Sequence, residues 1–437
     1  MMKRRTMGLI AVGVLSLGIL AGCGNSEKKE SSNPGEIKVW VQFSDETAEG
    51  KAWQEVVENF NKENEGKYKA TTEYIPRSGS GGGYEDKVNA AVSTNSLPDV
   101  ITLDGPNTAA YAQSKVIAPL DEYLEDADMD DVLDSIKQQG TYDGKMYAFG
   151  FSESNVGIYY NKKMFKEAGI SEAEIPTLEK PWTWSEFNQI AEKLQKKYDG
   201  PVFDMQIANK DEMLTYGYTP FVWSNGGNVV NEDGKKAEGY FDSKETIEAF
   251  EFIQNLVKKD YVPISPIEKG FEIEKYPMYL SGSWTMADLE ENYKDVDYGF
   301  LPYPVCDKTK KLVSPTGSWQ LGMTTSTKEK EASAEFIKFA TNTESSKIIS
   351  LGNSVLPIRN STIELIKDDV NDGMKMLMEQ NQISGQARPV VVAYPQVSRA
   401  FQQAIQDISY FEENPDVSKV LKARTKEMQQ AIDNSIK

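Results

Sequence analysis

Three tryptophans lie in segments rich in glycine, serine and asparagine, where a residue buried in a core is less expected. They are Trp223 in 221–227, Trp284 in 281–284 and Trp319 in 317–319. An indole has a flat apolar face and one polar group, and a pyranose has a flat C–H face edged by hydroxyls. Stacking combined with carboxylate and amide hydrogen bonds can therefore hold a neutral sugar. Each tryptophan alone is as well explained by burial, but the three together favour a binding cleft.

The chain has no histidine and only two cysteines. It therefore has no Ser-His or Cys-His nucleophile pair, no HExxH helix and no imidazole base. Three kinds of catalysis remain: carboxylate chemistry of the glycosidase type, Ser-Lys chemistry, and a metal held by oxygen ligands.

Two motif-like segments do not support a cofactor or a metal. The glycine run at 79–83 lacks the Lys-Ser/Thr that a phosphate loop needs, so a flexible loop at a cleft edge is the better interpretation. Asp126, Asp128 and Asp130 match the first half of a calcium loop, but Asp131 and Lys137 replace the required glycine and glutamate. We predict no cofactor and no metal.

Composition indicates a folded globular protein with an acidic surface. The chain has 437 residues, with 48 Lys+Arg against 67 Asp+Glu, and a net charge of −19. Hydrophobic residues make up 39% and the mean hydropathy is −0.52. The length allows two to three domains or one large α/β unit. The negative charge argues against a nucleic-acid partner, because the phosphate backbone is itself negative.

The N-terminus has the features of a lipoprotein signal. Lys3, Arg4 and Arg5 precede an apolar stretch at 7–20 that is too short to be taken as a membrane span. The sequence LAGC that ends at Cys23 resembles the lipobox of bacterial lipoproteins, in which the cysteine is lipidated after cleavage. We expect a signal peptide over 1–22 and a lipid anchor with a polar, flexible tether over 23–35. The alternative is a structural cysteine beside an ordinary signal peptide.

Hydrophobic periodicity predicts alternating strands and helices. Strands are expected at 37–41, 99–103 and 157–160, and helices at 53–60, 84–92, 244–259 and 328–341, with further long helices near the C-terminus. Thr183 and Glu186 have the spacing of a capping box at the start of another helix. This alternation predicts an α/β fold with a mostly parallel sheet.

Not every aromatic or sulfur-containing residue is a site candidate. Trp53 has helical spacing and is expected in the core. Trp182 and Trp184 flank the predicted helix start and are expected to pack against it. Cys306 is expected to be a buried structural thiol.

Several motifs, in order along the chain, resemble the extracellular solute-binding proteins, family 1, which include the sugar-binding lipoproteins of ABC importers, and within them the maltodextrin-binding type. The motifs are LPDVI at 97–101 followed by Asp104, YAFG at 147–150, YYNKKMFKEAGI at 159–170, PT at 176–177, WTWSEF at 182–187, GSW at 282–284 and GFLP at 299–302. The chain departs from this type in its glycine-rich loop and an insertion before Trp182.

The resemblance implies a two-lobed periplasmic-binding-protein type II fold. Each lobe is expected to have a mostly parallel sheet flanked by helices, with hinge crossovers near 149–155, 315–320 and 351–359. Lobe 1 is expected over 36–150 plus 321–350, and lobe 2 over 151–320 plus 351–437. A solute held between lobes agrees with the general position of ligand sites at the carboxyl ends of strands and at domain interfaces.

Candidate ligand-binding residues follow from this arrangement. They are Gln42, Phe43 and Asp45 after the first strand, Asp104 and Asn107 after the strand at 99–103, Glu153 and Asn155 at the crossover, Trp223, Gly282, Trp284 and Trp319 in loops, and Arg77, Arg388 and Tyr394 at the predicted lobe edges. Trp284 matches the family's stacking residue. Asp104 and Glu153 would accept sugar hydroxyls as carboxylates. A surface or salt-bridge role is an equal alternative for each arginine.

The resemblance implies the receptor of a bacterial sugar importer and not an enzyme. Its ligand would be a di- to tetrasaccharide, such as an α-glucoside. Its partners would be a permease pair with a cytoplasmic ATPase. We expect a monomer that is lipid-anchored on the outer face of the cytoplasmic membrane, as in a Gram-positive bacterium.

Two alternatives stay open. A secreted glycosidase would use Asp104 and Glu153 as acid and base. A receptor of the same fold would bind a polyamine, phosphate ester or peptide. A cation site would require acids clustered within one loop near the tryptophans, and those loops are instead rich in Gly, Ser and Asn.

Overall fold

The computed structural model describes residues 35–77, 83–410 and 415–436. The predicted signal peptide, Cys23, the tether up to residue 34 and the glycine run at 79–82 lie outside the described residues.

Within the described part of the chain, nine strands form one sheet with the path β2-β1-β3-β10-β6-β8-β7, β11 pairing with β10 and β9 with β6. Two further short strands, β4 and β5, pair with each other. The bounds are β1 Glu36–Val41, β2 Lys69–Tyr74, β3 Val100–Asp104, β4 Thr141–Tyr142, β5 Lys145–Met146, β6 Phe149–Asn161, β7 Phe203–Asp204, β8 Met278–Gly282, β9 Tyr298–Leu301, β10 Ser314–Met323 and β11 Gly385–Ala387.

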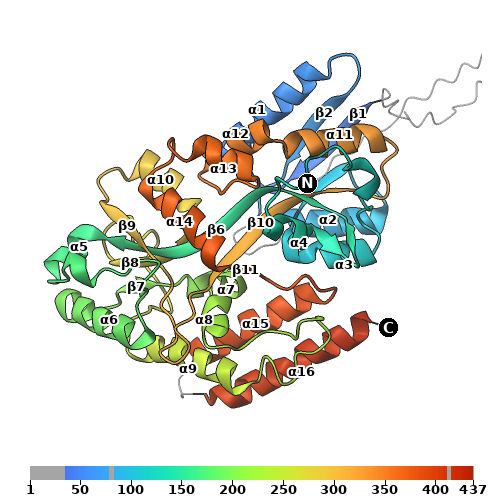
Figure 1. The fold of residues 1–437 in the computed structure, drawn as a ribbon. Coiled ribbons are helices and arrows are strands. Elements are labelled where there is room, and N and C mark those ends of the chain that lie inside the picture. The colour runs from blue at the N-terminus through green and yellow to red at the C-terminus, as the bar shows by residue number, and fades with distance from the viewer. Residues whose placement is uncertain (1–34, 78–82, 411–414, 437) are drawn as a thin grey trace, which may run out of the picture. The chain divides into compact units, whose positions relative to one another are not determined.

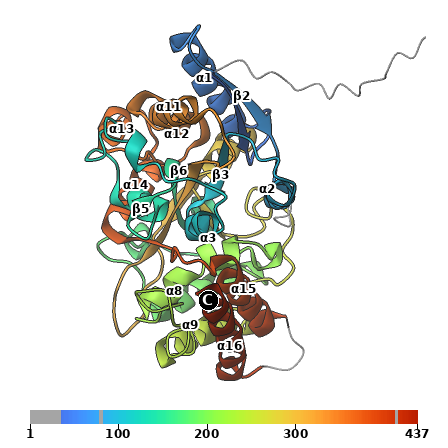
Figure 2. The same ribbon diagram turned by 90° about the vertical axis from the view of Figure 1, so that its right-hand side faces the viewer.

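Helices cover the sheet and follow its strands in sequence (Figure 1). Their bounds are α1 Ala48–Glu63, α2 Gly83–Thr94, α3 Thr108–Gln113, α4 Asp134–Gly140, α5 Lys162–Glu167, α6 Trp184–Tyr198, α7 Met213–Tyr216, α8 Thr219–Ser224, α9 Lys244–Lys258, α10 Thr285–Asn292, α11 Lys330–Ala340, α12 Thr343–Asn353, α13 Asn360–Ile366, α14 Asp372–Ser384, α15 Tyr394–Ser409 and α16 Val417–Ser435. The last two helices lie side by side (Figures 1 and 2).

The α/β prediction is confirmed, but the centre of the sheet is not parallel. β1 is parallel to β2 and β3, as expected for strands joined by helical crossovers. By contrast, β10 is antiparallel to β3 and β6, and β6 is antiparallel to β8 and β9. The reason is that β6 and β10 are long: β6 pairs with β10 over its first half and with β8 over its second. These two strands connect the parts of the sheet.

The hydrophobic residues gather in several clusters around this sheet. The largest takes Val156, Phe187, Phe250 and many others from the middle and the C-terminal part of the chain. A second cluster surrounds Trp53, against which Phe151 and Phe336 pack edge-on at 5.3 and 5.8 Å between ring centroids. The lobe boundaries expected from sequence stay a prediction.

Most predicted elements are present, but several strands, β2 among them, were not predicted. Trp53, Trp182, Trp184 and Cys306 are all buried, as predicted. β2 was not predicted because its sequence, KATTEY, is polar, and it lies at the edge of the sheet. An edge strand buries less of its surface, so it carries little hydrophobic signal.

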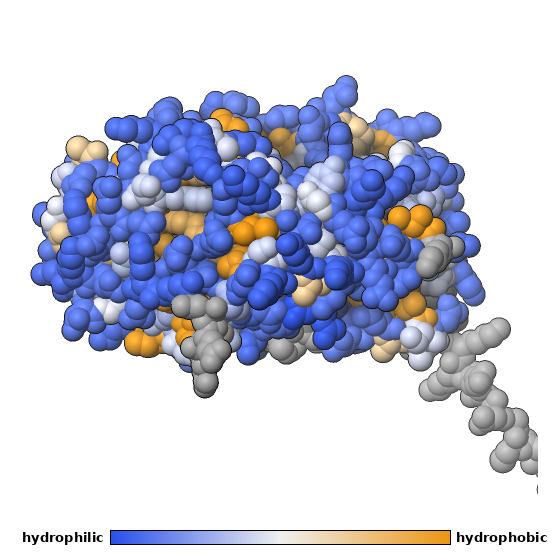
Figure 3. Space-filling model, turned by 90° about the horizontal axis from the view of Figure 1, so that it is seen from below, coloured by the Kyte–Doolittle hydropathy of each residue, from blue (hydrophilic) through white to orange (hydrophobic). Residues whose placement is uncertain are grey.

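The surface has few large apolar areas. On the face drawn in Figure 3, hydrophilic residues predominate and the hydrophobic patches are small and separated. Within residues 35–77, 83–410 and 415–436, no helix has the length and apolar character needed to cross a membrane.

The predicted capping box at the start of α6 is present and gives a stability prediction. The Thr183 hydroxyl accepts a hydrogen bond from the Glu186 N–H at 3.2 Å, and the Glu186 carboxylate accepts one from the Thr183 N–H at 2.8 Å. Thr183→Ala removes the cap and should lower the free energy of unfolding by about 1 kcal/mol in urea titrations.

Glu192→Gln on the exposed side of the same helix is the matched control. Glu192 pairs with Lys196 at the surface, one helical turn away, so its loss should cost under about 0.5 kcal/mol. Equal losses for both variants would contradict the cap's contribution.

Candidate functional site

A cavity of about 410 Å³ opens at the carboxyl end of β3, beside β10 and the loop that follows β7. Its lining combines indole rings, a phenol, amides, hydroxyls and charged groups. The lining residues are Arg77, Asp104, Ser154, Gln206, Asn209, Asp211, Glu212, Met213, Tyr216, Trp284, Gly317, Ser318, Trp319 and Arg388.

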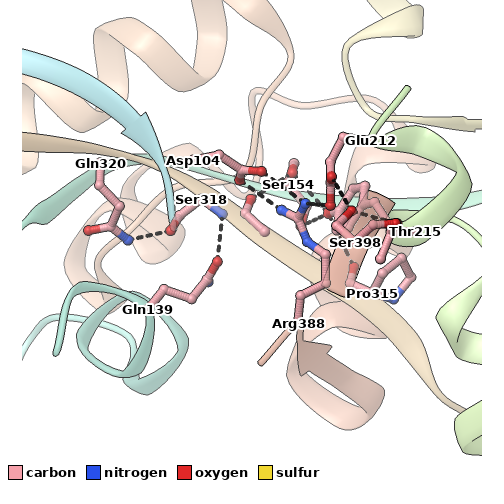
Figure 4. Close-up of polar contacts among 12 residues, drawn as sticks. Asp104, Gln139, Ser154, Glu212, Thr215, Pro315, Ser318, Gln320, Arg388 and Ser398 are labelled. Atoms are coloured by element: carbon pink, nitrogen blue, oxygen red, sulfur yellow. Dashed lines mark hydrogen bonds and ion pairs between the residues drawn. The ribbon is translucent and has the colours of Figure 1, made fainter. Parts of the chain in front are cut away.

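A buried guanidinium lies in the wall of this cavity. The Arg388 side chain is only 4% exposed. Its Nη1 and Nη2 donate to the two oxygens of Asp104 at 2.9 and 2.7 Å, and Nη1 also donates to Glu212 Oε1 at 2.6 Å (Figure 4). Arg388 therefore joins the end of β3 to the loop before α7.

Glu212 is held by further donors from α15. The Tyr394 hydroxyl donates to Glu212 Oε1, the Ser398 hydroxyl donates to Oε2 at 2.6 Å, and Gln402 donates to Oε2 at 3.3 Å. Burial alone would lower the pKa of Arg388, but the charge of Asp104, followed by Tyr394 and Glu212, outweighs burial and raises the pKa above its usual range. The network thus keeps Arg388 charged and leaves neither carboxylate free of donors.

Trp284 presents an indole to the cavity because residue 282 has no side chain. The Trp284 side chain is partly in solvent, with the residue 38% exposed. A Cβ on Gly282 would lie 2.1 Å from Cζ3 of that indole. The Gly282 carbonyl accepts a hydrogen bond from the Tyr159 hydroxyl at 2.7 Å, which holds the backbone in place. Gly282 therefore makes room for the ring of Trp284.

Trp319 and Tyr216 provide the other aromatic surfaces. Trp319 is half-buried and pairs with Asp104 across β10 and β3. The Arg77 guanidinium lies 5.0 Å from its ring centroid. The Arg388 guanidinium lies 4.6 Å from the centroid of Tyr216. Both arginines thus contact aromatic faces as well as carboxylates.

The floor of the cavity is a set of buried hydrogen bonds between β6, β10 and α4. The Ser154 hydroxyl donates to the Gly317 carbonyl at 2.7 Å. The Ser318 N–H donates to Gln139 Oε1 at 3.0 Å, and Gln320 Nε2 donates to Ser318 Oγ (Figure 4). The floor is therefore polar and fixed by its own partners.

Three carboxyl groups near Arg77 are affected by its positive charge. Arg77 Nε pairs with Glu85 Oε1 at 3.2 Å. Burial raises the pKa of Glu85, of Asp211, and of Glu49, the last to about 7, while the Arg77 charge acts in the opposite direction on each. One guanidinium therefore does not offset the removal of these carboxylates from water.

Several residues predicted from sequence meet at this cavity. Arg77, Asp104, Trp284, Trp319 and Arg388 line it. Tyr394 lies behind it and contacts Arg388 and Glu212. A salt-bridge role was the alternative for Arg77 and Arg388, and both arginines do form ion pairs, with Glu85 and Asp104 respectively.

Glu153 and Asn155 are not among the lining residues, although Ser154 between them is. Alternate side chains of a strand point to opposite faces. Glu153 is fully buried, and its carboxylate accepts from the Ser135 hydroxyl at 2.7 Å. Asn155 donates to the Ser314 hydroxyl at 3.0 Å and to the Pro315 carbonyl at 2.9 Å. The Glu153 carboxylate therefore joins β6 to α4, and the Asn155 amide joins β6 to β10, instead of facing the cavity.

The candidates after the first strand also lie outside the cavity lining. Gln42 is buried, and its carbonyl accepts from the Arg77 N–H at 3.2 Å. Phe43 packs edge-on against Trp53 at 6.1 Å. Asp45 is exposed.

Asn107 and Trp223 also lie outside the cavity lining. Asn107 ends a short 3₁₀ turn before α3. Trp223 is 3% exposed and donates to Asn228 Oδ1 at 3.3 Å beside a different cavity of about 390 Å³. The three loop tryptophans therefore do not share one cleft.

The loop after β7 was missed. Gln206, Asn209, Asp211 and Glu212 come from it, and Tyr216 comes from the short helix α7 that follows it. The available signal was positional: an apolar Val-Phe pair at 202–203 ends at Asp204, and a polar segment follows, as at other strand ends. The strand is only two residues long, so periodicity could not detect it.

The tryptophan loops themselves carry no cluster of acids, but other segments bring acids to them. The fold brings Asp104, Asp211 and Glu212 into the same cavity as Trp284 and Trp319. Within the described ranges, no group of three or more Asp, Glu or Cys side chains is placed to hold a metal ion.

Comparison with known proteins agrees with this architecture. The model of the bacterial extracellular solute-binding protein family matches residues 55–378, and the chain belongs to this family. Membership implies a location outside the cytoplasm. The chain is 26% identical over 373 residues to the diacetylchitobiose binding protein DasA of Streptomyces coelicolor, covering 82% of each chain.

Solved structures share the fold. The cyclic alpha-maltosyl-1,6-maltose binding protein from Arthrobacter globiformis is similar with a TM-score of 0.77 at 22% identity, covering 92% of this chain and all of that one. UgpB from Mycobacterium tuberculosis, in complex with glycerophosphocholine, is similar with a TM-score of 0.77 at 23% identity, covering 93% of this chain and all of that one. The fold is thus that of two-lobed, type II periplasmic binding proteins.

The raised pKa of Glu49 gives a pH prediction. A carboxyl whose folded-state pKa lies above its unfolded value binds a proton more tightly when folded, so its contribution to stability falls as pH rises from the unfolded pKa to the folded one. Glu49→Gln should therefore match the parent protein near pH 4.5 and be more stable by about 3 kcal/mol near pH 8. Urea unfolding across this pH range measures the difference.

The control is Glu46→Gln at an exposed position nearby. It should leave the pH profile of the unfolding free energy unchanged. A Glu49→Gln profile parallel to that of the parent would contradict the burial effect.

Proposed function

We propose that the protein is the substrate-binding lipoprotein of a carbohydrate ABC importer. It captures a di- to tetrasaccharide, such as an α-glucoside, in the cavity lined by Trp284 and Trp319. The named ligands of its relatives, diacetylchitobiose and cyclic alpha-maltosyl-1,6-maltose, are oligosaccharides.

The observation that carries this proposal is the exposed indole of Trp284. A large aromatic side chain that is 38% exposed at the mouth of a polar cavity has not been buried by the protein's own fold. A pyranose ring can stack on such a face while Asp211, Asn209 and Gln206 accept or donate hydrogen bonds at the ring's edge.

Closure of two lobes around the sugar would complete the site. With the boundaries expected from sequence, Asp104 belongs to lobe 1, whereas Glu212 and Arg388 belong to lobe 2. The ion pair between Arg388 and Asp104 would then join the two lobes, whereas the pair with Glu212 would lie within lobe 2. The long strands β6 and β10 would act as the hinge crossovers.

The remaining steps depend on the N-terminus and on partners. Cys23 would carry the lipid that anchors the protein on the outer face of the cytoplasmic membrane, as in Gram-positive bacteria. The protein would act as a monomer and deliver the sugar to a permease pair driven by a cytoplasmic ATPase.

Binding without catalysis is the better supported function. A glycosidase needs two carboxyl groups on either side of one glycosidic bond. Of the pair considered for this role, Asp104 has both oxygens bonded to Arg388, and Glu153 is fully buried outside the cavity lining.

A thermal-shift scan against mono- to pentasaccharides tests the proposal. A ligand that binds only the folded state raises the unfolding midpoint by mass action. We expect a rise for one oligosaccharide series, with the sugar recovered intact. Shortened sugars would indicate a glycosidase, and no rise with any sugar would indicate another solute.

Removing the indole should weaken sugar binding. Trp284→Ala should raise the dissociation constant by about tenfold to a hundredfold in isothermal titration, as expected for loss of a central aromatic contact. Tyr240→Ala is the matched control, because Tyr240 is 39% exposed but lies outside this cavity. Equal effects of the two substitutions would contradict the assignment.

Gly282 should affect sugar affinity only through the position of the Trp284 indole. Gly282→Ala would push the indole aside and weaken binding by about tenfold. In the Trp284→Ala background the same change should have almost no further effect on affinity. A full additional loss in that background would show that Gly282 contributes to binding by another route.

A further inference from the structure

The cavity described above has more negative than positive charge. Its lining contains three carboxylates and two guanidinium groups, for a net charge of −1. The excess is not removed by neighbours, because the side chain that pairs with Arg77 is a further carboxylate, Glu85. A ligand that enters the cavity therefore meets an unbalanced negative field.

Among these carboxylates, Asp211 is the one with capacity for a ligand. Both oxygens of Asp104 are bonded to Arg388, and both oxygens of Glu212 accept from Arg388 or from α15 side chains. The Asp211 carboxylate accepts a hydrogen bond from the Met213 N–H to Oδ1 at 3.0 Å, and it has no ion pair among the described residues. A half-buried carboxylate without a cation is a favourable partner for one.

The cations already present cannot take this role. Both terminal nitrogens of Arg388 are already bonded to Asp104 and Glu212. Arg77 is bonded to Glu85 and stacked on Trp319, and burial still raises the pKa of Asp211 despite the charge of Arg77. The missing positive charge has to come from the ligand.

We propose that the cavity selects oligosaccharides that carry a free, protonated amino group, which binds Asp211, over neutral sugars of the same length and linkage. This inference rests on the proposed function, since Trp284 still supplies the stacking surface for the ring. An ammonium group both donates to a carboxylate oxygen and offsets the excess charge. An anionic sugar would add to that excess and is disfavoured.

Two β-1,4-linked series that differ at one substituent test the proposal. Glucosamine tri- and tetrasaccharides carry an ammonium group where the cello-oligosaccharides carry a hydroxyl, and the N-acetylated series restores neutrality. In mildly acidic buffer, where the amines are protonated, we expect the glucosamine series to bind at least about tenfold more tightly than either neutral series. Equal or weaker binding would overturn the proposal, as would binding of neutral sugars of another linkage only.

Two substitutions test whether Asp211 is the source of the preference for the charged sugars. Asp211→Asn keeps a hydrogen-bond acceptor but removes the charge, so it should weaken binding of the glucosamine series by more than binding of a neutral sugar and remove most of the preference between them. Asp143→Asn, which removes one negative charge at an exposed site outside the cavity, is the matched control and should change neither. An equal loss for charged and neutral sugars in Asp211→Asn would reduce Asp211 to a hydrogen-bond acceptor and overturn the proposal.

Two outcomes of a thermal-shift scan that also includes spermidine separate this inference from the proposed function. If neutral oligosaccharides raise the unfolding midpoint but the glucosamine series does not, the sugar receptor stands and the charge selectivity fails. If no sugar raises it, or if spermidine alone does, the proposed function itself fails and this inference fails with it.

Discussion

The site depends on one buried guanidinium. Removing the Arg388 side chain from water is costly unless its charge is matched at short range. Asp104 and Glu212 match it, although they are 284 and 176 residues away in the sequence. Three distant segments are thereby held together: the end of β3, the loop before α7 and the segment after β11. Each of them brings cavity residues with it, because Asp104 lies opposite Trp319 in the sheet and Glu212 follows Asp211.

Around this ion cluster, strand alternation decides which side chains are available to a ligand. In β6 only Ser154 reaches the cavity, whereas Glu153 and Asn155 turn away and bond to neighbouring segments. Gly282 shows a second kind of constraint, since a residue without a side chain is what allows the Trp284 indole to lie where it does. The terminal nitrogens of Arg388 and the carboxylates of Asp104 and Glu212 bond to one another. The exposed indole of Trp284 and the carboxylate of Asp211, which has no ion pair among the described residues, are therefore the groups most available to a ligand.

Local features of the sequence predicted local features of the structure. The strand at 37–41, the helix around Trp53 and the capping box of Thr183 and Glu186 are present because each is determined by residues close in the chain. The polar edge strand β2 left no such pattern. The candidate site was predicted only in part for the same reason. Arg77, Asp104, Trp284, Trp319 and Arg388 were singled out, but the ion pairing of Arg388 with Asp104 and the position of Asp211 depend on segments that meet only in the folded chain. Side-chain type alone also could not predict that Ser154, and not its neighbour Glu153, lines the cavity.

The most direct test of this account is a crystal structure of the protein with a bound oligosaccharide from the series that gives the largest thermal shift. The account predicts a pyranose ring stacked on Trp284, with Arg388 still paired to Asp104 and Glu212. A sugar bound away from Trp284, or an Arg388 that leaves both carboxylates to bind the sugar, would contradict it.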